Sequence, residues 1–436
     1  MDRRDFMLGI GASVGSGFMD WPRPAQAIAV PQQKQVGIEN FIADAQAINV
    51  QTSLPFRGYI RTNWSKDPFS CGAYSHIAKG SSIEDVVILG TPIDERVFFA
   101  GEAVNPNYQS TVHAAYESGT STADAIIAAG RQSVGIVGAG AAGLAAAQRL
   151  HDAGVKVQVF EARDRMGGRV WTDRRLGPAL EKGAAFIVGT NGNPLSQLAD
   201  NVAAKRVGFG IDDAENDVVI DRDGQEISRT ARPGWLEEVT LSNAMGTDYT
   251  NLNLEHLENN QEHYFGNYTG GNVVLPNGYD QILGPLQTGY EVKLNAIVGR
   301  IAYNNSGAEI GLNDNSLHSF DAVVITVPLG VLKAGKIIFD PVLSEDKIGA
   351  IKRMGMGTVD KLFLMFDERF WYDAPWIYTP DTDLPRGQFN LWMTHHTLGT
   401  NVLAAFNPGK AAHDLASETD AAIVEKALRV LELAYG

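Results

Sequence analysis

The clearest pattern of apolar and polar positions along the chain lies between residues 133 and 161. Residues 133–137 form a short apolar run, which is typical of a buried parallel strand. Residues 144–153 are rich in alanine and are followed by Gly154, which predicts a helix and its end. Residues 155–160 alternate like a second strand. This order of strand, helix and strand predicts an α/β fold with a parallel sheet.

The pattern predicts three further elements elsewhere in the chain. Apolar positions at helical spacing over residues 422–436 predict an amphipathic helix. The dipeptide at residues 223–224, Asp-Gly, predicts the turn of a hairpin. Residues 254–261 predict a polar helix.

A glycine motif connects the first strand to the helix. Gly138, Gly140 and Gly143 fit G-x-G-x-x-G, and Glu161 follows 23 residues after the first glycine. Gly138 permits a tight turn, Gly140 lets the backbone approach a pyrophosphate, and Gly143 lets the helix pack closely on the strand. The helix amino terminus attracts phosphates, and Glu161 can accept hydrogen bonds from a ribose. The complete unit predicts a dinucleotide site.

Composition narrows the function classes. The 436 residues allow two or three domains with a large core, and no apolar run reaches the roughly 18 residues needed to span a membrane. The net charge of −15 excludes nucleic acid as a partner; it could attract cationic substrates, although solubility explains it more simply. Cys71 is the only cysteine, so no intrachain disulfide can form. The sequence leaves a homodimer open.

The amino terminus predicts export. Arg3-Arg4 precedes a weakly apolar, glycine-rich stretch, and Ala25-Gln26-Ala27 fits a cleavage site. This is the pattern of a twin-arginine signal over residues 1–27, which directs folded proteins across the membrane. We therefore expect a periplasmic or secreted protein.

The residues that follow the second strand carry a family resemblance. Residues 161–169, EARDRMGGR, resemble the E-A-R-x-R-x-G-G-R motif of the flavin-containing amine oxidase family, whose members include monoamine oxidases, polyamine oxidases and histone demethylases. The resemblance implies FAD, with Arg163, Gly168 and Arg169 against its phosphates and flavin; a solvated turn is the alternative for the arginines. Residues 270–279, 292–301 and 321–328 resemble further family elements. The second of these is expected to be the strand whose Val298 backbone meets the adenine.

The family's elements occur in a rotated order. Residues 61–75, 96–103 and 108–119 resemble segments that normally close the chain, yet here they precede the glycine motif. We expect a circular permutant, with the usual termini joined near residues 130–132 and new ends near residue 50; a scrambled or misassembled gene is the alternative. The implied fold is a Rossmann-type FAD-binding domain of the glutathione-reductase kind with an α+β substrate-binding domain. We expect the FAD-binding domain at 87–190 and 270–333, the substrate-binding domain at 55–86, 191–269 and 334–436, and a new N-terminal segment at 28–54.

The same resemblance implies the catalytic residues. Residues 355–364 resemble the strand whose lysine, here Lys361, assists the reaction of reduced flavin with oxygen; burial should depress its pKa. An edge-strand lysine that reaches solvent is the alternative. Tyr74 matches one member of the aromatic cage that aligns the amine, and Thr111 takes the place of the second, which weakly favours a bulkier or extended amine. Glu102 matches a residue near the FAD phosphates and ribityl chain. Trp64 is expected to pack beside the flavin, and simple packing is the alternative for Tyr74.

These matches predict an FAD-dependent amine oxidase with a small-molecule amine as substrate and oxygen as acceptor. FAD should be held non-covalently, because Ala73 stands where monoamine oxidases have the flavin-linked cysteine. An L-amino-acid oxidase is the main alternative, but residues 181–189 lack the arginine that would pair with a carboxylate. Another flavin oxidoreductase of the same fold and a non-catalytic FAD-binding remnant are the remaining alternatives. The sequence predicts no metal site.

Overall fold

The computed structural model describes residues 48, 50–210, 217–228, 233–259, 268–395 and 398–436. The predicted signal at 1–27 and most of the segment 28–54 lie outside the described residues, so export stays a prediction. No described helix is long and apolar enough to cross a membrane.

A five-stranded parallel sheet contains the predicted strand–helix–strand unit. Its strands are all parallel to their neighbours and follow the order β12, β5, β4, β16, β3. Every side chain of β16 is buried, as expected for a parallel strand covered on both faces. The bounds are β3 Val97–Phe99, β4 Ser133–Val137, β5 Lys156–Phe160, β12 Glu291–Lys293 and β16 Ala322–Ile325. The α/β prediction with a parallel sheet is confirmed.

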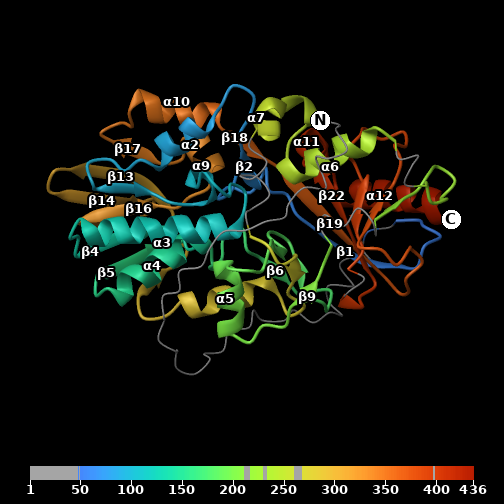
Figure 1. The fold of residues 1–436 in the computed structure, drawn as a ribbon, viewed down its shortest axis with the longest axis horizontal. Helices are drawn as coiled ribbons and strands as arrows, with labels where there is room; N and C mark the ends of the chain where they lie inside the picture. Colours follow the sequence, from blue (N-terminus) through green and yellow to red (C-terminus); the bar gives the residue numbers. More distant parts are fainter. Residues whose placement is uncertain (1–47, 49, 211–216, 229–232, 260–267, 396–397) are drawn as a thin grey trace.

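Different layers cover the two faces of this sheet. Helices α3 (Val112–Ala128) and α4 (Ala141–Asp152) lie together on one face (Figure 1). A four-stranded sheet of order β15, β14, β13, β17 covers the other. Gly135 permits this approach, because a β-carbon there would come within 2.6 Å of the Phe320 ring. The bounds are β13 Val298–Asn304, β14 Gly307–Leu312, β15 Leu317–Phe320 and β17 Ile338–Asp340.

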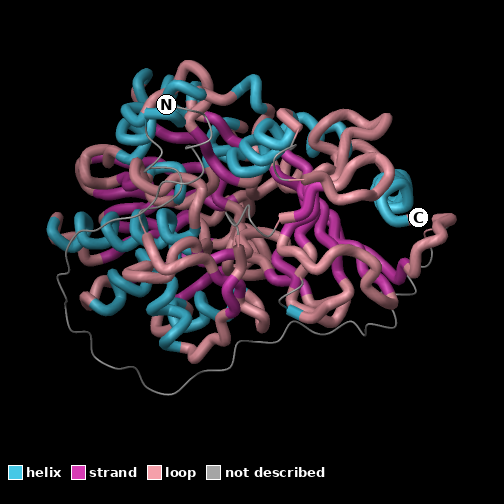
Figure 2. The backbone as a smooth tube through the Cα atoms, turned by 45° about the vertical axis from the view of Figure 1, so that its right-hand side comes forward, coloured by secondary structure: helices cyan, strands magenta, loops and turns pink. Residues whose placement is uncertain are grey.

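A six-stranded mixed sheet forms the other half of the molecule. Its order is β1, β19, β22, β21, β20, β10, and only the pairing of β10 with β20 is parallel. Helix α12 (Asp420–Tyr435) buries most of its apolar positions in the core beside this sheet. Figure 2 shows the strands of the two halves as separate groups joined by loops. The bounds are β1 Phe56–Arg61, β10 Val218–Val219, β19 Val359–Phe366, β20 Trp376–Tyr378, β21 Leu391–Met393 and β22 Val402–Pro408.

Short strands and helices complete the described fold. The remaining strands are β2 Tyr74–His76, β6 Thr172–Asp173, β7 Leu180–Glu181, β8 Phe186–Ile187, β9 Val207–Gly208, β11 Val273–Val274 and β18 Gly355–Gly357. The remaining α-helices are α2 Ile83–Gly90, α5 Pro194–Asn201, α6 Trp235–Met245, α7 Leu254–Asn259, α9 Leu329–Lys333, α10 Glu345–Arg353 and α11 Gly409–Leu415. The 3-10 helices are η2 Glu102–Val104, η4 Tyr249–Asn251 and η5 Tyr279–Leu286.

The structure corrects two element boundaries. Helix α4 begins at Ala141 instead of residue 144, directly after the glycine turn. The single strand expected over residues 292–301 is wrong: β12 ends at Lys293 and β13 begins at Val298. Asn295, at φ +56°, turns the chain between them, because the two strands belong to different sheets. The turn at residues 223–224 and the helices near residues 254 and 422 are confirmed.

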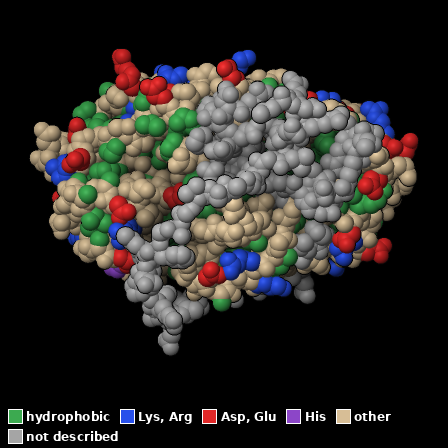
Figure 3. All heavy atoms as spheres, viewed as in Figure 1, with side chains coloured by type: hydrophobic (Ala, Val, Ile, Leu, Met, Phe, Trp, Pro, Cys, Tyr) green, Lys and Arg blue, Asp and Glu red, His purple; other side chains and the backbone are tan. Residues whose placement is uncertain are grey.

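Charged side chains are spread over the visible surface. On the face shown in Figure 3, acidic and basic groups are interspersed and do not gather into one large patch of a single sign.

Candidate active site

A central cavity of about 1090 Å³ lies between the two halves of the molecule. Its lining residues come from the glycine turn after β4, the loop after β5, β19 and β22, and helix α6. This volume exceeds that of most small-molecule sites, which favours a large cofactor together with a substrate. All thirteen predicted site residues except Gly143 line the cavity.

The glycine turn leaves space where phosphates would approach. Gly138 has φ +105°, a backbone conformation that favours glycine, and a β-carbon at Gly140 would meet no atom within 4 Å. A β-carbon at Gly143 would lie 2.0 Å from the carbonyl oxygen of Gly138, so Gly143 serves helix packing. No side chain caps the start of α4 at Gly140. The free N–H groups of this helix end therefore face the cavity side and fit a pyrophosphate.

A second glycine pair docks on this turn. Gly167 donates its backbone N–H to the carbonyl oxygen of Ala139 at 2.8 Å. Gly168 has φ +57°, and its β-carbon would lie 3.3 Å from the α-carbon of Gly140. The E-A-R-x-R-x-G-G-R segment thus packs its backbone against the glycine turn, which explains why it needs two glycines.

Glu161 shapes the turn from the end of β5. Its carboxylate accepts the backbone N–H of Ala139 at 2.7 Å and that of Arg163 at 2.9 Å. Both oxygens have lone pairs left for a further donor, such as a ribose hydroxyl. Glu161 therefore both holds the glycine turn and remains a candidate ribose ligand.

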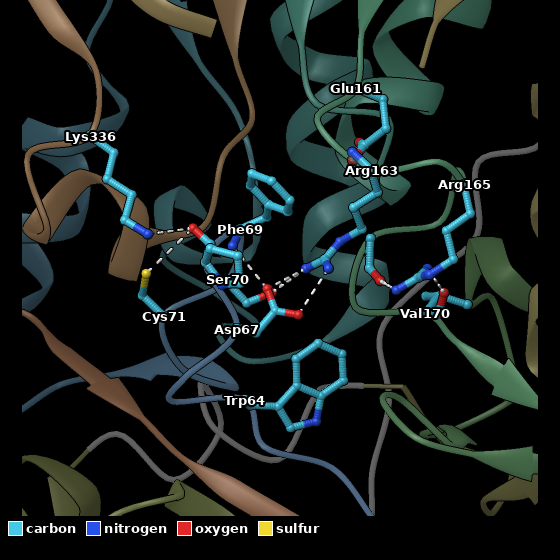
Figure 4. A network of polar contacts seen from close by, with 12 residues as sticks. Trp64, Asp67, Phe69, Ser70, Cys71, Glu161, Arg163, Arg165, Val170 and Lys336 are labelled. Atoms are coloured by element: carbon cyan, nitrogen blue, oxygen red, sulfur yellow. Dashed lines mark hydrogen bonds and ion pairs between the residues drawn. The ribbon is translucent and has the colours of Figure 1, made fainter. Parts of the chain in front are cut away.

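The Arg163 guanidinium is paired with an acid from the segment after β1. It donates to both oxygens of Asp67, at 2.7 and 2.9 Å, and to the hydroxyl of Ser70 (Figure 4). This pair lowers the pKa of Asp67, although burial of that carboxyl opposes the shift. The neighbouring Arg165 donates to the carbonyl oxygen of Gly168 at 2.8 Å. Arg163 is therefore not a solvated residue, and it joins the two segments that flank the cavity.

Glu102 gathers several donors at one edge of the cavity. Its carboxylate accepts the N–H and hydroxyl of Ser75, the N–H of Ser110 and the Arg169 guanidinium, the last at 2.8 Å. Arg169 also donates to the carbonyl oxygen of Ala73. These donors hold the carboxylate in one position. Glu102 and Arg169 together join the segment before Tyr74 to the loop that contains Gly167 and Gly168.

Lys361 lies in the middle of β19, which pairs with β1 and β22, so the edge-strand alternative is wrong. The side chain is 8% exposed, and its ammonium donates to the carbonyl oxygens of Glu181 at 2.8 Å and Gly183 at 2.6 Å. It lies 5.0 Å from the ring centre of Phe406. Burial lowers the pKa of Lys361 to about 8, while the charge of Glu181 opposes the shift. An ammonium has three N–H bonds, so one remains for a ligand in the cavity.

Tyr74 and Thr111 face the cavity from different elements. Tyr74, in β2, donates its hydroxyl to the carbonyl oxygen of Asn243 in α6 at 2.6 Å. Burial raises the pKa of this phenol, so it stays neutral. Thr111 caps α3, because its hydroxyl accepts the N–H of Ala114 and donates to the carbonyl oxygen of Tyr108. The Thr111 hydroxyl is therefore held by its own helix end.

Trp64 and Val298 complete the predicted set. The Trp64 indole N–H donates to the carbonyl oxygen of Lys182 at 3.2 Å, and its ring packs edge-on against Trp171. Val298 begins β13, beside the lining residues Ala296 and Ile297. Both positions are compatible with packing around a cofactor.

Three residues near this site were missed by sequence reasoning. Asp360 accepts the backbone N–H of Trp64 at 2.7 Å and the hydroxyl of Thr62 at 2.8 Å, so it positions Trp64. Glu181 supports Lys361, and Phe406 faces it from β22. Asp360 could have been found from the sequence, because it is an acid directly before a lysine that is predicted to be buried. The sequence matched residues 181–189 to a family element but linked neither Glu181 nor Phe406 to Lys361, because both meet Lys361 only through the tertiary fold.

Aromatic side chains line the part of the cavity nearest the six-stranded sheet. Trp376, Tyr378 and Phe406 come from its strands, and Phe186 comes from β8. Phe186 and Trp376 lie 6.3 Å apart, and Trp376 and Phe406 lie 5.4 Å apart, between ring centres. Such a chamber suits the apolar part of a substrate and excludes water from the reacting end.

Comparison with known proteins places this site in a family. The sequence profile of the flavin containing amine oxidoreductases matches residues 42–127, 141–248 and 229–436. Lysine-specific histone demethylase 1B of Mus musculus is 28% identical over 356 residues, which cover 69% of this chain and 43% of that protein. Polyamine oxidase 4 of Oryza sativa subsp. japonica is 29% identical over 350 residues, which cover 67% of this chain and 71% of that protein.

A lysine-specific histone demethylase 2 of Homo sapiens is 31% identical over 291 residues, or 55% of this chain and 35% of that protein. The chain thus spans less than half the length of these histone demethylases. The profile, in contrast, covers most of the chain, and family membership implies a flavin cofactor. By this match and by the cavity that fits a dinucleotide, the chain belongs to the flavin-containing amine oxidoreductases.

Proposed function

We propose that the protein is an FAD-dependent amine oxidase that acts on a primary or secondary amine. The observation that carries this proposal is Lys361, buried in the cavity wall with two of its N–H bonds held by carbonyl oxygens. When bound, FAD supplies a hydride acceptor and passes the electrons to oxygen, so the substrate yields an imine that hydrolyses to an aldehyde, together with hydrogen peroxide.

The glycine wall of the cavity, which is the turn around Gly138, Gly140 and Gly143, would hold the cofactor. The N–H groups at the start of α4 and the open space at Gly140 would receive the pyrophosphate, and Glu161 would accept a ribose hydroxyl. Val298 and its neighbours would contact the adenine end. FAD would be bound non-covalently, because Cys71 is not among the lining residues and its thiol donates to the carbonyl oxygen of Pro68 (Figure 4).

The wall around Lys361 and the aromatic chamber would hold the amine and the reactive part of the cofactor. The Tyr74 ring and the aromatic chamber would orient a neutral amine, and the hydroxyl bond to Asn243 fixes the Tyr74 ring. The remaining N–H of Lys361 would bind a water or oxygen-derived ligand beside the cofactor. Its positive charge favours the reduction of oxygen, which creates negative charge.

The paired arginines favour an amine over an amino acid. The described arginines that line the cavity are Arg163 and Arg169, and they are engaged by Asp67 and Glu102 respectively. A substrate carboxylate would therefore find no guanidinium that is not already paired within the described lining. An L-amino-acid oxidase is less well supported for this reason.

A substrate panel tests the proposal. Purified yellow protein is supplied with monoamines, polyamines, N-methylated lysine peptides and amino acids in air, and hydrogen peroxide and aldehyde are measured. We expect peroxide and aldehyde with at least one amine and neither with amino acids. Turnover of an amino acid alone would overturn the proposal. A protein without flavin that takes up none on incubation with FAD would support the remnant instead.

We also propose that the chain is a circular permutant of the family's usual order. Helix α12 ends beside the start of the described chain, since Glu432 accepts hydrogen bonds from Thr52 and from Ser53, the latter at 2.8 Å. Helix α3 ends at Ala128, only a few residues before β4. A gene that links residue 436 to residue 52 and opens between residues 130 and 132 should therefore give a folded, flavin-binding protein. An insoluble product from that gene would contradict this proposal.

The twin-arginine signal remains a proposal about localisation. Fractionation of cells that express the full chain should place the protein outside the cytoplasm. A double substitution, Arg3→Lys with Arg4→Lys, should retain it in the cytoplasm with its flavin. Export of both forms alike would contradict the proposal.

A further inference from the structure

Glu181 is an acid with an unusual position beside the reacting lysine. It ends β7, and its backbone oxygen accepts the Lys361 ammonium. Its carboxylate points to other partners: it accepts the backbone N–H of Tyr279 at 2.7 Å and the hydroxyl of Thr172 at 2.8 Å. The residue therefore contacts Lys361 through its backbone oxygen, while its carboxylate is held by Tyr279 and Thr172.

A second, small cavity lies beside the central one. Its volume is about 20 Å³, and its lining includes Glu181, Lys361, His395 and Phe406. Lys361 and Phe406 line both cavities, so they form part of the wall between them. The space is large enough for one water molecule with polar partners. Such a water would give the carboxyl and the ammonium a path for proton exchange.

The charged surroundings couple the two groups. Burial raises the pKa of Glu181 to about 7, with Asp280 raising it further and Lys361 lowering it. Burial lowers the pKa of Lys361 to about 8, with Glu181 raising it. Asp280 is itself paired with Arg174 at the surface, and the neutral phenol of Tyr279 lies on the same side. Each group therefore shifts the pKa of the other, which is the condition for a coupled titration.

We propose that Glu181 is a positioning residue that controls the protonation of Lys361. The two buried side chains share protons behind the part of the cavity wall that Lys361 forms. The role of this residue pair in oxygen reduction rests on the proposed function. The pair itself is a property of these side chains, whether or not an amine is turned over.

Proton titration of Lys361 by NMR tests the pair directly. The full chain, as purified with its cofactor, is labelled with ¹³C at the lysine ε-carbons, and Lys361→Met assigns the signal. The signal is followed between about pH 6 and pH 10 in the wild type and in Glu181→Gln. The amide keeps the bond from Tyr279 but removes the negative charge. We expect the apparent pKa of Lys361 to fall by about one unit.

Two further variants make the test specific. Thr172→Val removes one hydrogen bond to the carboxylate, so Glu181 should stay neutral to higher pH, and the Lys361 pKa should fall by a smaller amount. Asp280→Asn removes a nearby exposed charge and leaves Glu181 in place, so it should shift Lys361 far less than Glu181→Gln.

An unchanged or raised Lys361 pKa in Glu181→Gln would overturn the proposal, as would an equal shift in Asp280→Asn. If Glu181→Gln does not fold, the comparison of Thr172→Val with Asp280→Asn decides. The outcome does not depend on turnover, so a protein that oxidises no amine but shows the shift would refute only the proposed function.

Discussion

The glycine wall around Gly138, Gly140 and Gly143 and the lysine wall around Lys361 border the same cavity with different groups. The glycine wall exposes backbone N–H groups and space that no side chain fills. The lysine wall contains a buried ammonium whose pKa burial lowers to about 8. We propose that the first binds the cofactor by close fit and that the second acts through a charge that changes near neutral pH. Substitutions that add bulk should therefore impair cofactor binding at the glycine wall. Changes of charge or pH should impair the reaction at the lysine wall.

The largest effect is expected at Gly143. Gly143→Val would force a side chain against the carbonyl oxygen of Gly138, with the first atom at 2.0 Å. We expect almost complete loss of FAD and a destabilisation of about 3 kcal/mol. The ratio of flavin to protein absorbance and the denaturation midpoint measure both effects.

Gly140→Ala is the matched control, because its β-carbon meets no protein atom within 4 Å. Its flavin-free form should keep its stability within about 0.5 kcal/mol. Its FAD affinity should nevertheless fall about tenfold, since the methyl group occupies the space for the pyrophosphate. Equal FAD affinity in this variant and the wild type would place the cofactor elsewhere.

The second effect is on the reaction with oxygen. Lys361→Met removes the ammonium from the cavity wall, and we expect reoxidation of the reduced enzyme to slow about 100-fold at unchanged FAD content. Stopped-flow mixing of reduced enzyme with oxygen measures this rate. Lys347→Met is the control: Lys347 is also buried, with a pKa lowered to about 8, but it caps α2 and does not line the cavity. That control should lose stability and keep its reoxidation rate.

The third effect is the pH dependence of the same step. Lys361 is charged below a pKa of about 8 and neutral above it. Because the ammonium stabilises negative charge on reduced oxygen, the reoxidation rate should fall as the pH rises through about 8. The same stopped-flow rate, measured across this range, checks the sign. A rate that rises through pH 8 would mean that the neutral amine is the active form.

The fourth effect concerns stability. Burial raises the folded-state pKa of Glu181 from 4.5 to about 7, so its folded form binds more protons than its unfolded form between these values. The contribution of Glu181 to stability is therefore full below pH 4.5 and is lost as the pH rises through 7. The free energy of unfolding of Glu181→Gln, relative to that of the wild type, should be higher at pH 8 than at pH 5. Chemical denaturation at both pH values measures the difference, and a difference of opposite sign would refute the shift.

The smallest effect is expected at Tyr74. Tyr74→Phe keeps the ring and removes the hydroxyl that donates to Asn243, which should cost about 1 kcal/mol of stability. Amine turnover should change only a few-fold, because the ring that orients the substrate remains. Thermal denaturation and steady-state kinetics measure the two effects, and a large loss of turnover would assign the hydroxyl a chemical role.

The sequence predicted the glycine wall more completely than the lysine wall. The turn, the helix and Glu161 lie within 24 consecutive residues, so local pattern and spacing describe nearly the whole cradle. Lys361 was predicted from its segment, but Glu181 and Phe406 reach it from residues 180 and 45 positions away. Such contacts arise from the pairing of distant strands, which no local pattern encodes. The pairing of Arg163 with Asp67 was missed for the same reason.

Anaerobic titration of the purified yellow protein with amines tests the central claim most directly, because it joins the cofactor on one wall to the substrate on the other. We expect that at least one amine bleaches the flavin, that about one equivalent suffices for each flavin, and that added oxygen restores the colour. Flavin that no amine bleaches, or that only an amino acid bleaches, would contradict it.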